Sequence, residues 1–225
     1  MKIKLIVAFI TLSSNIISAQ TIPLPTPALE KGWERVKIEF LGTIDLPLNM
    51  EIQGGNYKQY MDNLKEINGV SASRVIFQQK NLNNLNQSSF NTYARVFIRT
   101  ETGTSGEFKR LRTSSFSQSE LTELNNSYKN EIQQELSRAN ASANANAKIL
   151  EWYQAKQTTV NGMTCITFGY KRQIGSNPPV NVTFYFFHNY DRMHVLTFEY
   201  RISDADMWAG TFDKVLKSYR ITNIK

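Results

Sequence analysis

The chain has two histidines, which stand close together with an acid between them as His188, Asp191 and His194. Imidazole and carboxylate groups are ligands for zinc. Strand-like residues flank these positions, so they lie at the tip of a predicted hairpin. A three-residue loop, Tyr190 to Arg192, would pair the histidines on one face and let Asp191 complete a metal site. A loop of two or four residues would send the histidines to opposite faces.

The simpler interpretation of this hairpin is two unrelated polar residues at its tip, because a metal site needs several ligands that converge with correct geometry. Nucleophilic catalysis has no better support, since no G-x-S-x-G motif accompanies the histidines. Cys165 is the only cysteine and lies within a strand-like run, which indicates a buried hydrophobe and excludes an intramolecular disulfide. Asp204 and Asp206 are best explained as acids at the start of the last helix.

The sequence therefore predicts no catalytic residue and no cofactor, and no glycine-rich phosphate loop occurs. A carboxylate pair of the glycosidase type is a possibility that sequence alone leaves open. Aromatic residues could line a carbohydrate site, but in strands and on a helix stripe they are usually core residues. The three tryptophans are Trp33, Trp152 and Trp208.

The densest basic cluster of the chain is Lys109, Arg110 and Arg112, in a polar loop over 101–115. Its functional interpretation is a contact with an anion or an acidic partner. The simpler interpretation is a solvated loop, because surface charge commonly serves solubility. Elsewhere acids and bases are interspersed, so the formal charge of +7 does not indicate nucleic-acid binding.

The N-terminus, residues 1–19, has the pattern of a secretory signal peptide. Lys2 and Lys4 precede an apolar run over 5–12, and small residues lead to Ala19. A retained membrane anchor would need about 20 apolar residues. Removal of both lysines reduces 26 basic residues to 24 against 19 acids, a charge of +5. We expect an exported protein, periplasmic or secreted, that is not integral to a membrane after cleavage.

Residues 20–30 hold three prolines and are expected to form an extended linker or, equally, an arm along the domain. Residues 31–225 are long enough for one domain with a sizeable core. Alternating apolar residues predict strands over 33–41, 44–50, 74–79 and 93–100. Pro47 is expected to confine the second strand to a sheet edge, and a short helix is expected over 57–67.

The best helix signal covers 117–138, where Ser117 and Glu120 form a capping box. The following tract over 139–147 alternates alanine and asparagine, which predicts a frayed end or a loop. From 148 to 202, strand-like runs separated by turn residues predict an antiparallel meander. Asn161-Gly162 is its strongest hairpin signal. The run over 180–188 is apolar on both faces, as in a strand covered on both sides, and a last amphipathic helix follows.

This succession of elements resembles the PsbP-like proteins, a fold shared by a thylakoid-lumen photosystem subunit, a nuclear Ran-binding factor and many exported bacterial proteins. The stretches that carry the resemblance are FLGTIDLP, the hairpin at Asn161-Gly162-Met163, VTFYFF with RMHVLTFEYR, and FDKVLKSYRI. The resemblance implies an α+β fold, an α/β/α sandwich with a central antiparallel sheet flanked by helices. It also implies a binding or assembly module, since most members are not enzymes.

Two functions are therefore expected. The first is an exported, non-enzymatic binding or accessory module of the bacterial cell envelope or extracellular space, with a protein or envelope component as partner. It predicts a groove or an apolar patch without convergent titratable side chains. The second is a hydrolase or ligand-binding protein that acts on envelope or extracellular polymers. It predicts a concave pocket with perturbed carboxylates or histidines.

Overall fold

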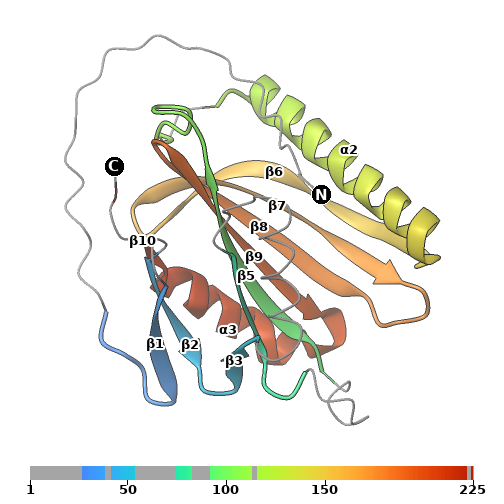
Figure 1. Ribbon diagram of the computed structural model, residues 1–225, viewed down its shortest axis with the longest axis horizontal. Coiled ribbons are helices and arrows are strands. Elements are labelled where there is room, and N and C mark those ends of the chain that lie inside the picture. The colour runs from blue at the N-terminus through green and yellow to red at the C-terminus, as the bar shows by residue number, and fades with distance from the viewer. Residues whose placement is uncertain are drawn as a thin grey trace, which may run out of the picture.

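The centre of the protein is a seven-stranded antiparallel sheet (Figure 1), seen in a computed structural model that describes residues 27–38, 42–53, 74–82, 92–112, 116–221 and 224. The strand order is β3-β4-β5-β9-β8-β7-β6. The strands are β3 (Met50–Ile52), β4 (Arg74–Gln79), β5 (Ala94–Thr102), β6 (Ala147–Val160), β7 (Met163–Ile174), β8 (Val180–Asn189) and β9 (Arg192–Arg201).

The last four strands form the predicted meander. Asn161 and Gly162 turn the chain between β6 and β7 with φ of 52° and 74°, the left-handed conformation that this dipeptide tolerates. β8 lies between β7 and β9, as the apolar residues on both of its faces predict. The predicted strand over 93–100 corresponds to β5, which joins the meander by pairing with β9.

A second sheet contains β1 (Trp33–Ile38), β2 (Gly42–Pro47) and β10 (Arg220–Ile221), with β2 in the middle. Pro47 was expected to confine this strand, β2, to a sheet edge, and that prediction was wrong. Pro47 is the last residue of β2, opposite Trp33, so its missing amide falls where the pairing ends. Gly42 allows β10 to pair, since a Cβ at this position would lie 1.9 Å from the carbonyl oxygen of Arg220.

The helix α2 (Gln118–Ala143) begins with the predicted capping box. Ser117 Oγ accepts the amide of Glu120 at 3.3 Å, and the Glu120 carboxylate accepts the amide of Ser117 at 2.7 Å. The helix continues into the alanine- and asparagine-rich tract, where a frayed end or loop was expected. Asn144 ends it in the left-handed conformation, and Asn140 fixes the next strand by bonding both polar groups of the Ala147 backbone.

The helix α2 and a helix over 205–218 cover opposite faces of the central sheet (Figure 1), which confirms the α+β sandwich. Tyr128 of α2 packs on Phe168 and Phe186. The second helix, α3 (Ala205–Ser218), follows a short 3-10 turn, η2 (Ile202–Asp204), and packs mainly on β9 and β2. The helix expected over 57–67 lies outside the described residues, as do residues 1–26.

Candidate functional site

A groove of about 650 Å³ opens beside α3, over the strands β6, β7 and β8. Thr167 and Gly169 of β7 and Thr183 and Tyr185 of β8 lie in it, and Leu216 lies on its α3 side. The groove exists because α3 packs mainly on β9 and β2 rather than over these three strands. Its volume falls in the range of about 300–1,000 Å³ that is typical of small-molecule sites.

Tyr153 of β6 forms part of the groove and lies close to the sheet over Gly169. A Cβ at Gly169 would stand 3.0 Å from Tyr153 Cδ2 and 2.4 Å from the carbonyl oxygen of Val182, so glycine makes room for the ring. The Tyr153 side chain shares a hydrogen bond with Lys171, whose Nζ lies 2.5 Å from the Glu151 carboxylate. Burial is the main cause of the raised pKa of Tyr153.

Tyr185 is the second aromatic side chain of the groove with a hydroxyl group. It shares a side-chain hydrogen bond with Thr167, and its ring meets Phe198 edge-on with centroids 5.8 Å apart. Burial raises the pKa of Tyr185 as well. Both tyrosines therefore stay neutral and can donate as well as accept hydrogen bonds.

The rest of the groove is rich in hydroxyl and amide groups. Among the described residues that line the groove, Asp213 has the only carboxylate. It pairs with Lys217 of the same helix at 2.5 Å. Neither a histidine nor a cysteine is among these lining residues. The hydroxyl and amide side chains besides the two tyrosines are Gln154, Thr158, Thr159, Asn161, Thr167 and Thr183.

The opposite face of the same strands is closed by α2. Trp152, Phe168, Phe184 and Phe186 stack on one another and on Tyr128, with centroid distances of 4.4 to 6.2 Å. A buried amide fixes the helix to a bulged part of β6. Asn125 Oδ1 of α2 accepts Trp152 Nε1 at 2.7 Å and the Ala155 amide at 3.1 Å, where the β6–β7 register shifts.

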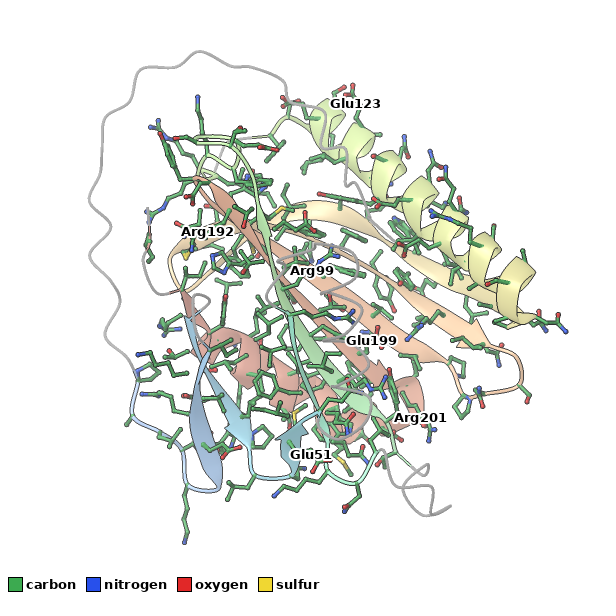
Figure 2. All side chains as sticks on the ribbon, in the orientation of Figure 1. Glu51, Arg99, Glu123, Arg192, Glu199 and Arg201 are labelled. Carbon is green, nitrogen blue, oxygen red and sulfur yellow. The ribbon has the colours of Figure 1, made fainter. Side chains whose placement is uncertain are left out.

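A buried charged network lies farther along the α2 face, at Glu199 of β9 (Figure 2). Its carboxylate accepts Tyr93 Oη at 2.6 Å and Arg172 Nη2 at 2.9 Å. Desolvation is the largest single effect on Arg172 and lowers its pKa, but the coulombic effects of Glu199, Tyr93 and Tyr170 and the hydrogen bond to Glu199 together outweigh it, so the pKa is raised. Burial raises the pKa of Tyr93. The buried carboxylate is therefore both hydrogen-bonded and paired with a cation, as a structural ion pair requires.

The structure does not bring His188, Asp191 and His194 together. Asn189 pairs with Arg192, so the loop holds only Tyr190 and Asp191, and His188 faces Met193 while His194 faces Phe187. A two-residue loop puts the histidines on opposite faces of the sheet, because side chains alternate along each strand. The condition for a metal site at this hairpin is therefore not met.

Each histidine has a local partner. His188 Nδ1 donates to the Lys109 carbonyl oxygen at 3.2 Å, and burial lowers its pKa. His194 is fully buried, with Nδ1 3.1 Å from Tyr219 Oη and Nε2 without a partner among the described residues. Burial lowers the pKa of His194 to about 4, so the side chain is neutral at pH 7.

Cys165 is buried, and this burial raises the pKa of its thiol to about 12. A thiol in this state is a poor nucleophile, because the thiolate is the reactive form. Asp204 accepts the Tyr93 amide at 3.0 Å instead of capping α3 through its side chain. Within the described ranges, no three His, Cys, Asp or Glu side chains gather in a way that could hold a metal ion.

The basic loop packs against the histidine hairpin, which places two separate sequence features in one region. Phe108 and Tyr190 form a backbone bridge, with amide-to-carbonyl distances of 2.8 and 2.6 Å. Lys109 and Arg112 are exposed, whereas Arg110 is half-buried and desolvation lowers its pKa. The carbonyl oxygen of Arg112 accepts Gln157 Nε2 at 2.8 Å.

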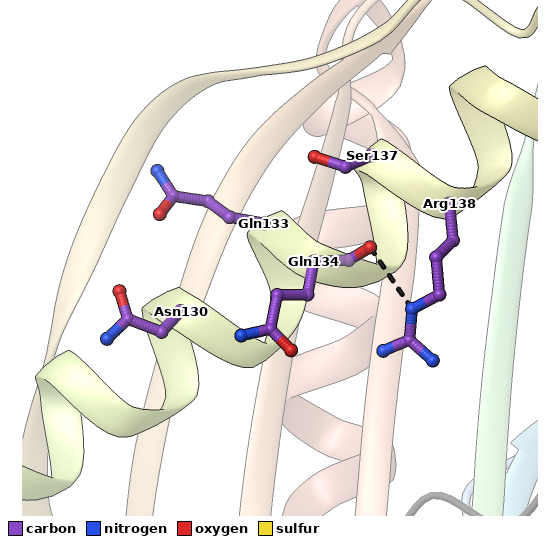
Figure 3. A pocket seen from close by; sticks show the side chains of 5 residues that line it. All are labelled: Asn130, Gln133, Gln134, Ser137 and Arg138. Carbon is purple, nitrogen blue, oxygen red and sulfur yellow. Dashed lines mark hydrogen bonds between the residues drawn. The ribbon is translucent and has the colours of Figure 1, made fainter.

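A shallow depression on the outer surface of α2 is lined by that helix alone (Figure 3). Arg138 Nε donates to the Gln134 carbonyl oxygen at 3.3 Å. The depression gathers no pair of titratable groups and shows the ordinary exposed side of an amphipathic helix. Its lining residues are Asn130, Gln133, Gln134, Ser137 and Arg138. Neither this helix nor α3 is both long and apolar enough to cross a membrane, within the described part of the chain.

A scan against protein-family models finds no match, and no curated protein matches the chain. Among solved structures, the chain is similar to cyanobacterial PsbP from Synechocystis sp. PCC 6803, with 12% identity and a TM-score of 0.48 over 89% of this chain and 99% of that one.

Two further structures are similar at lower scores. One is a Bacteroides thetaiotaomicron VPI-5482 protein, with 8% identity and a TM-score of 0.38 over 85% of this chain and 49% of that one. The other is a Pseudomonas aeruginosa protein of unknown function, with 9% identity and a TM-score of 0.36 over 82% of this chain and 94% of that one.

Sequence reasoning found the basic loop and missed the groove. Thr167, Gly169, Thr183 and Tyr185 alternate with core residues along β7 and β8. A strand covered on both sides was expected there, so the polar side chains carried no separate signal. Gly169 is the one residue that could have indicated the groove, because glycine within a strand often marks a close approach of another group.

Proposed function

We propose that this protein is an exported, non-enzymatic binding module of the bacterial cell envelope, and that the groove beside α3 holds a segment of an envelope polysaccharide. The proposal combines the signal-peptide pattern of residues 1–19 with the chemistry of the groove. The observation that carries it is the lining of neutral hydroxyl and amide side chains around Tyr153 and Tyr185.

A polysaccharide suits this lining because each sugar presents hydroxyl groups that both donate and accept hydrogen bonds. Thr and Tyr hydroxyls have the same double capacity, and amides supply a donor and an acceptor. The face of a tyrosine ring gives an apolar platform while its hydroxyl stays wet. An oligosaccharide of N-acetylglucosamine carries both hydroxyl and amide groups and is therefore the appropriate probe.

Binding rather than hydrolysis is favoured by the titratable groups of the groove. Hydrolysis of a glycosidic bond usually requires two carboxyl groups that flank it. Asp213 is the only acid among the described lining residues, and Lys217 pairs with it. The alternative, a hydrolase acting on envelope or extracellular polymers, therefore has less support from this region.

The proposal is tested by calorimetric titration of the purified protein with an N-acetylglucosamine tetrasaccharide. The variant Tyr185→Phe with Thr183→Val removes two hydroxyl groups from the groove floor and keeps the shapes of both side chains. Because each lost hydrogen bond costs about 0.5–1.5 kcal/mol, we expect affinity to fall by about tenfold.

The matched control is Tyr190→Phe with Thr122→Val, which removes two hydroxyl groups outside the groove. We expect this control to bind like the wild type. Equal affinities of the groove variant and the wild type, or hydrolysis of the probe during the titration, would contradict the proposal.

A further inference from the structure

The end of the sheet that carries the β8–β9 turn is a rigid, basic protrusion. We define the basic tip as the loop over 103–112 together with Tyr190, Asp191 and Arg192. The loop is held to the turn by its backbone, since the Gly103 amide donates to the Asp191 carbonyl oxygen at 2.8 Å and Phe108 bridges Tyr190. Figure 1 shows the loop and the turn side by side at one end of β5 and β9.

Tyr190 is the exposed aromatic residue of the basic tip. Its side chain is 44% exposed although it stands at the end of a well-paired strand. Its backbone has φ of 67°, a left-handed conformation that is unfavourable for a bulky residue. Asparagine or glycine would adopt this turn at lower cost, so the folding of the hairpin does not explain a tyrosine here.

Two contacts position the ring. Tyr190 is fixed at both backbone groups, because its amide donates to Phe108 at 2.6 Å and its carbonyl oxygen accepts at 2.8 Å. A Cβ at Gly106 would stand 3.9 Å from the Tyr190 ring and 3.8 Å from Lys109 Cε. The ring and the lysine side chain therefore both lie beside Gly106, so an aromatic and a basic group stand in the same part of the surface.

The charge of the basic tip is positive. Its basic side chains are Lys109, Arg110, Arg112 and Arg192. Of its two acids, Asp191 pairs with Arg192 at 3.1 Å, and Glu107 accepts the Thr104 amide at 2.6 Å and the Thr104 hydroxyl at 3.0 Å. Figure 2 shows Arg192 near the start of β9, at this end of the sheet.

We propose that the basic tip binds membrane surfaces that contain anionic lipids, with the Tyr190 ring at the headgroup level and Lys109 and Arg112 beside the phosphates. Tyrosine is favoured at the membrane–water interface, where its ring is buried and its hydroxyl stays hydrated. Basic residues close to an anionic surface strengthen the attachment. A stable protein partner would instead require about 20–30 residues on each side, more than the basic tip offers.

The proposal is tested by sedimentation of the full protein with lipid vesicles. We expect binding to vesicles of phosphatidylcholine mixed with phosphatidylglycerol, and little binding to phosphatidylcholine alone. Raising the salt from about 0.1 M to about 1 M should release the protein, because the Debye length falls from about 10 Å to about 3 Å.

Two variants measure separately what the basic side chains and the Tyr190 ring contribute to vesicle binding. Lys109→Gln with Arg112→Gln should weaken binding by about 30-fold, since each basic residue contributes about fivefold at an anionic surface. The backbone carbonyl oxygens that His188 and Gln157 use are retained. Tyr190→Asn should also weaken binding, while its melting temperature stays equal or rises because asparagine tolerates this turn.

The matched control is Lys31→Gln with Lys148→Gln, which removes the same charge from exposed positions elsewhere. It should retain most of the binding, and Tyr185→Phe with Thr183→Val should bind vesicles like the wild type, since the groove is a separate site. Equal losses in the tip and control variants would overturn the proposal, as would full binding by Tyr190→Asn. Binding to polyglutamate without binding to anionic vesicles would assign the basic tip to an acidic protein partner instead.

Discussion

The strands β6, β7 and β8 present two faces that differ in how they are covered. On one face α2 closes an aromatic stack around Phe168 and Phe186. On the other face α3 packs mainly on β9 and β2, and the groove with Tyr153 and Tyr185 stays open. The same sheet therefore has a closed, stabilising side and a side with an open groove, where we propose that binding occurs. The position of the helix decides which face is free.

The largest expected effect lies on the closed face. Phe186→Ala removes a side chain that is 1% exposed and stacked between Tyr128, Phe168 and Phe184. We expect the free energy of unfolding to fall by about 3–5 kcal/mol, because the stack cannot collapse around the cavity. Urea unfolding followed by tryptophan fluorescence measures it. A loss below about 1 kcal/mol would mean that α2 does not close this face tightly.

Much of this closed face could be predicted from the sequence. The capping box at Ser117 and Glu120 located the start of α2. The end of α2 could not be predicted, because the intrinsic preferences of alanine and asparagine conflict and the tertiary bond from Asn140 to Ala147 decides the outcome.

The next effect concerns how α2 is fixed to the bulged strand. Asn125→Ala leaves the Trp152 indole nitrogen and the Ala155 amide without their acceptor. We expect a loss of about 2–3 kcal/mol, since each buried unsatisfied donor costs about 1–3 kcal/mol. Asn125→Asp keeps the acceptor and serves as the control. Equal losses in both variants would show that the acceptor is not what matters at this position.

The free energy of unfolding is expected to depend on pH because of His194, which is buried on the α3 side of the sheet. Burial lowers the pKa of His194 to about 4 in the folded protein. Tyr219, which directly follows α3, contacts its ring, and Thr100 of β5 is its pairing partner in the sheet. Arg192 disfavours its protonation further. The unfolded chain binds the proton at its ordinary pKa, so the stability is fully present above about pH 6.5 and is lost as the pH falls toward the folded value.

We expect about 2 kcal/mol to be lost between about pH 6.5 and pH 5, measured by urea unfolding at each pH. His194→Asn should remove most of this dependence. His188 contributes in the same direction because burial also lowers its pKa, and His188→Asn determines its share. A pH dependence that persists in His194→Asn at its full size would contradict the assignment.

The groove on the open face was harder to predict from the sequence than the fold. Basic residues cluster in the sequence itself, so the loop at Lys109 was visible without a structure. The groove exists because α3 packs toward β9 rather than over β6, β7 and β8. This position depends on contacts between segments that are distant in sequence. Phe212 packs on Phe198 and Tyr200 of β9, and Trp208 packs on Phe212. These contacts fix the position of α3, and no periodicity in the helix predicts them.

The hairpin of the two histidines shows the same limit at a smaller scale. The number of residues in its loop decides whether His188 and His194 share a face, and the sequence allowed several loop lengths. Tyr190 in the left-handed conformation makes the two-residue turn possible. A bulky residue is uncommon in this conformation, so turn propensities gave no reason to expect it.

The central claim is that the open face binds a polysaccharide. The most direct measurement is the nuclear magnetic resonance spectrum of the aromatic side chains during titration with the N-acetylglucosamine tetrasaccharide. We predict that the resonances of Tyr153 and Tyr185 shift and saturate, while those of Phe168 and Phe186 beneath α2 stay in place. Shifts confined to the closed stack or to Tyr190, or the absence of any shift in the two groove tyrosines, would contradict the account.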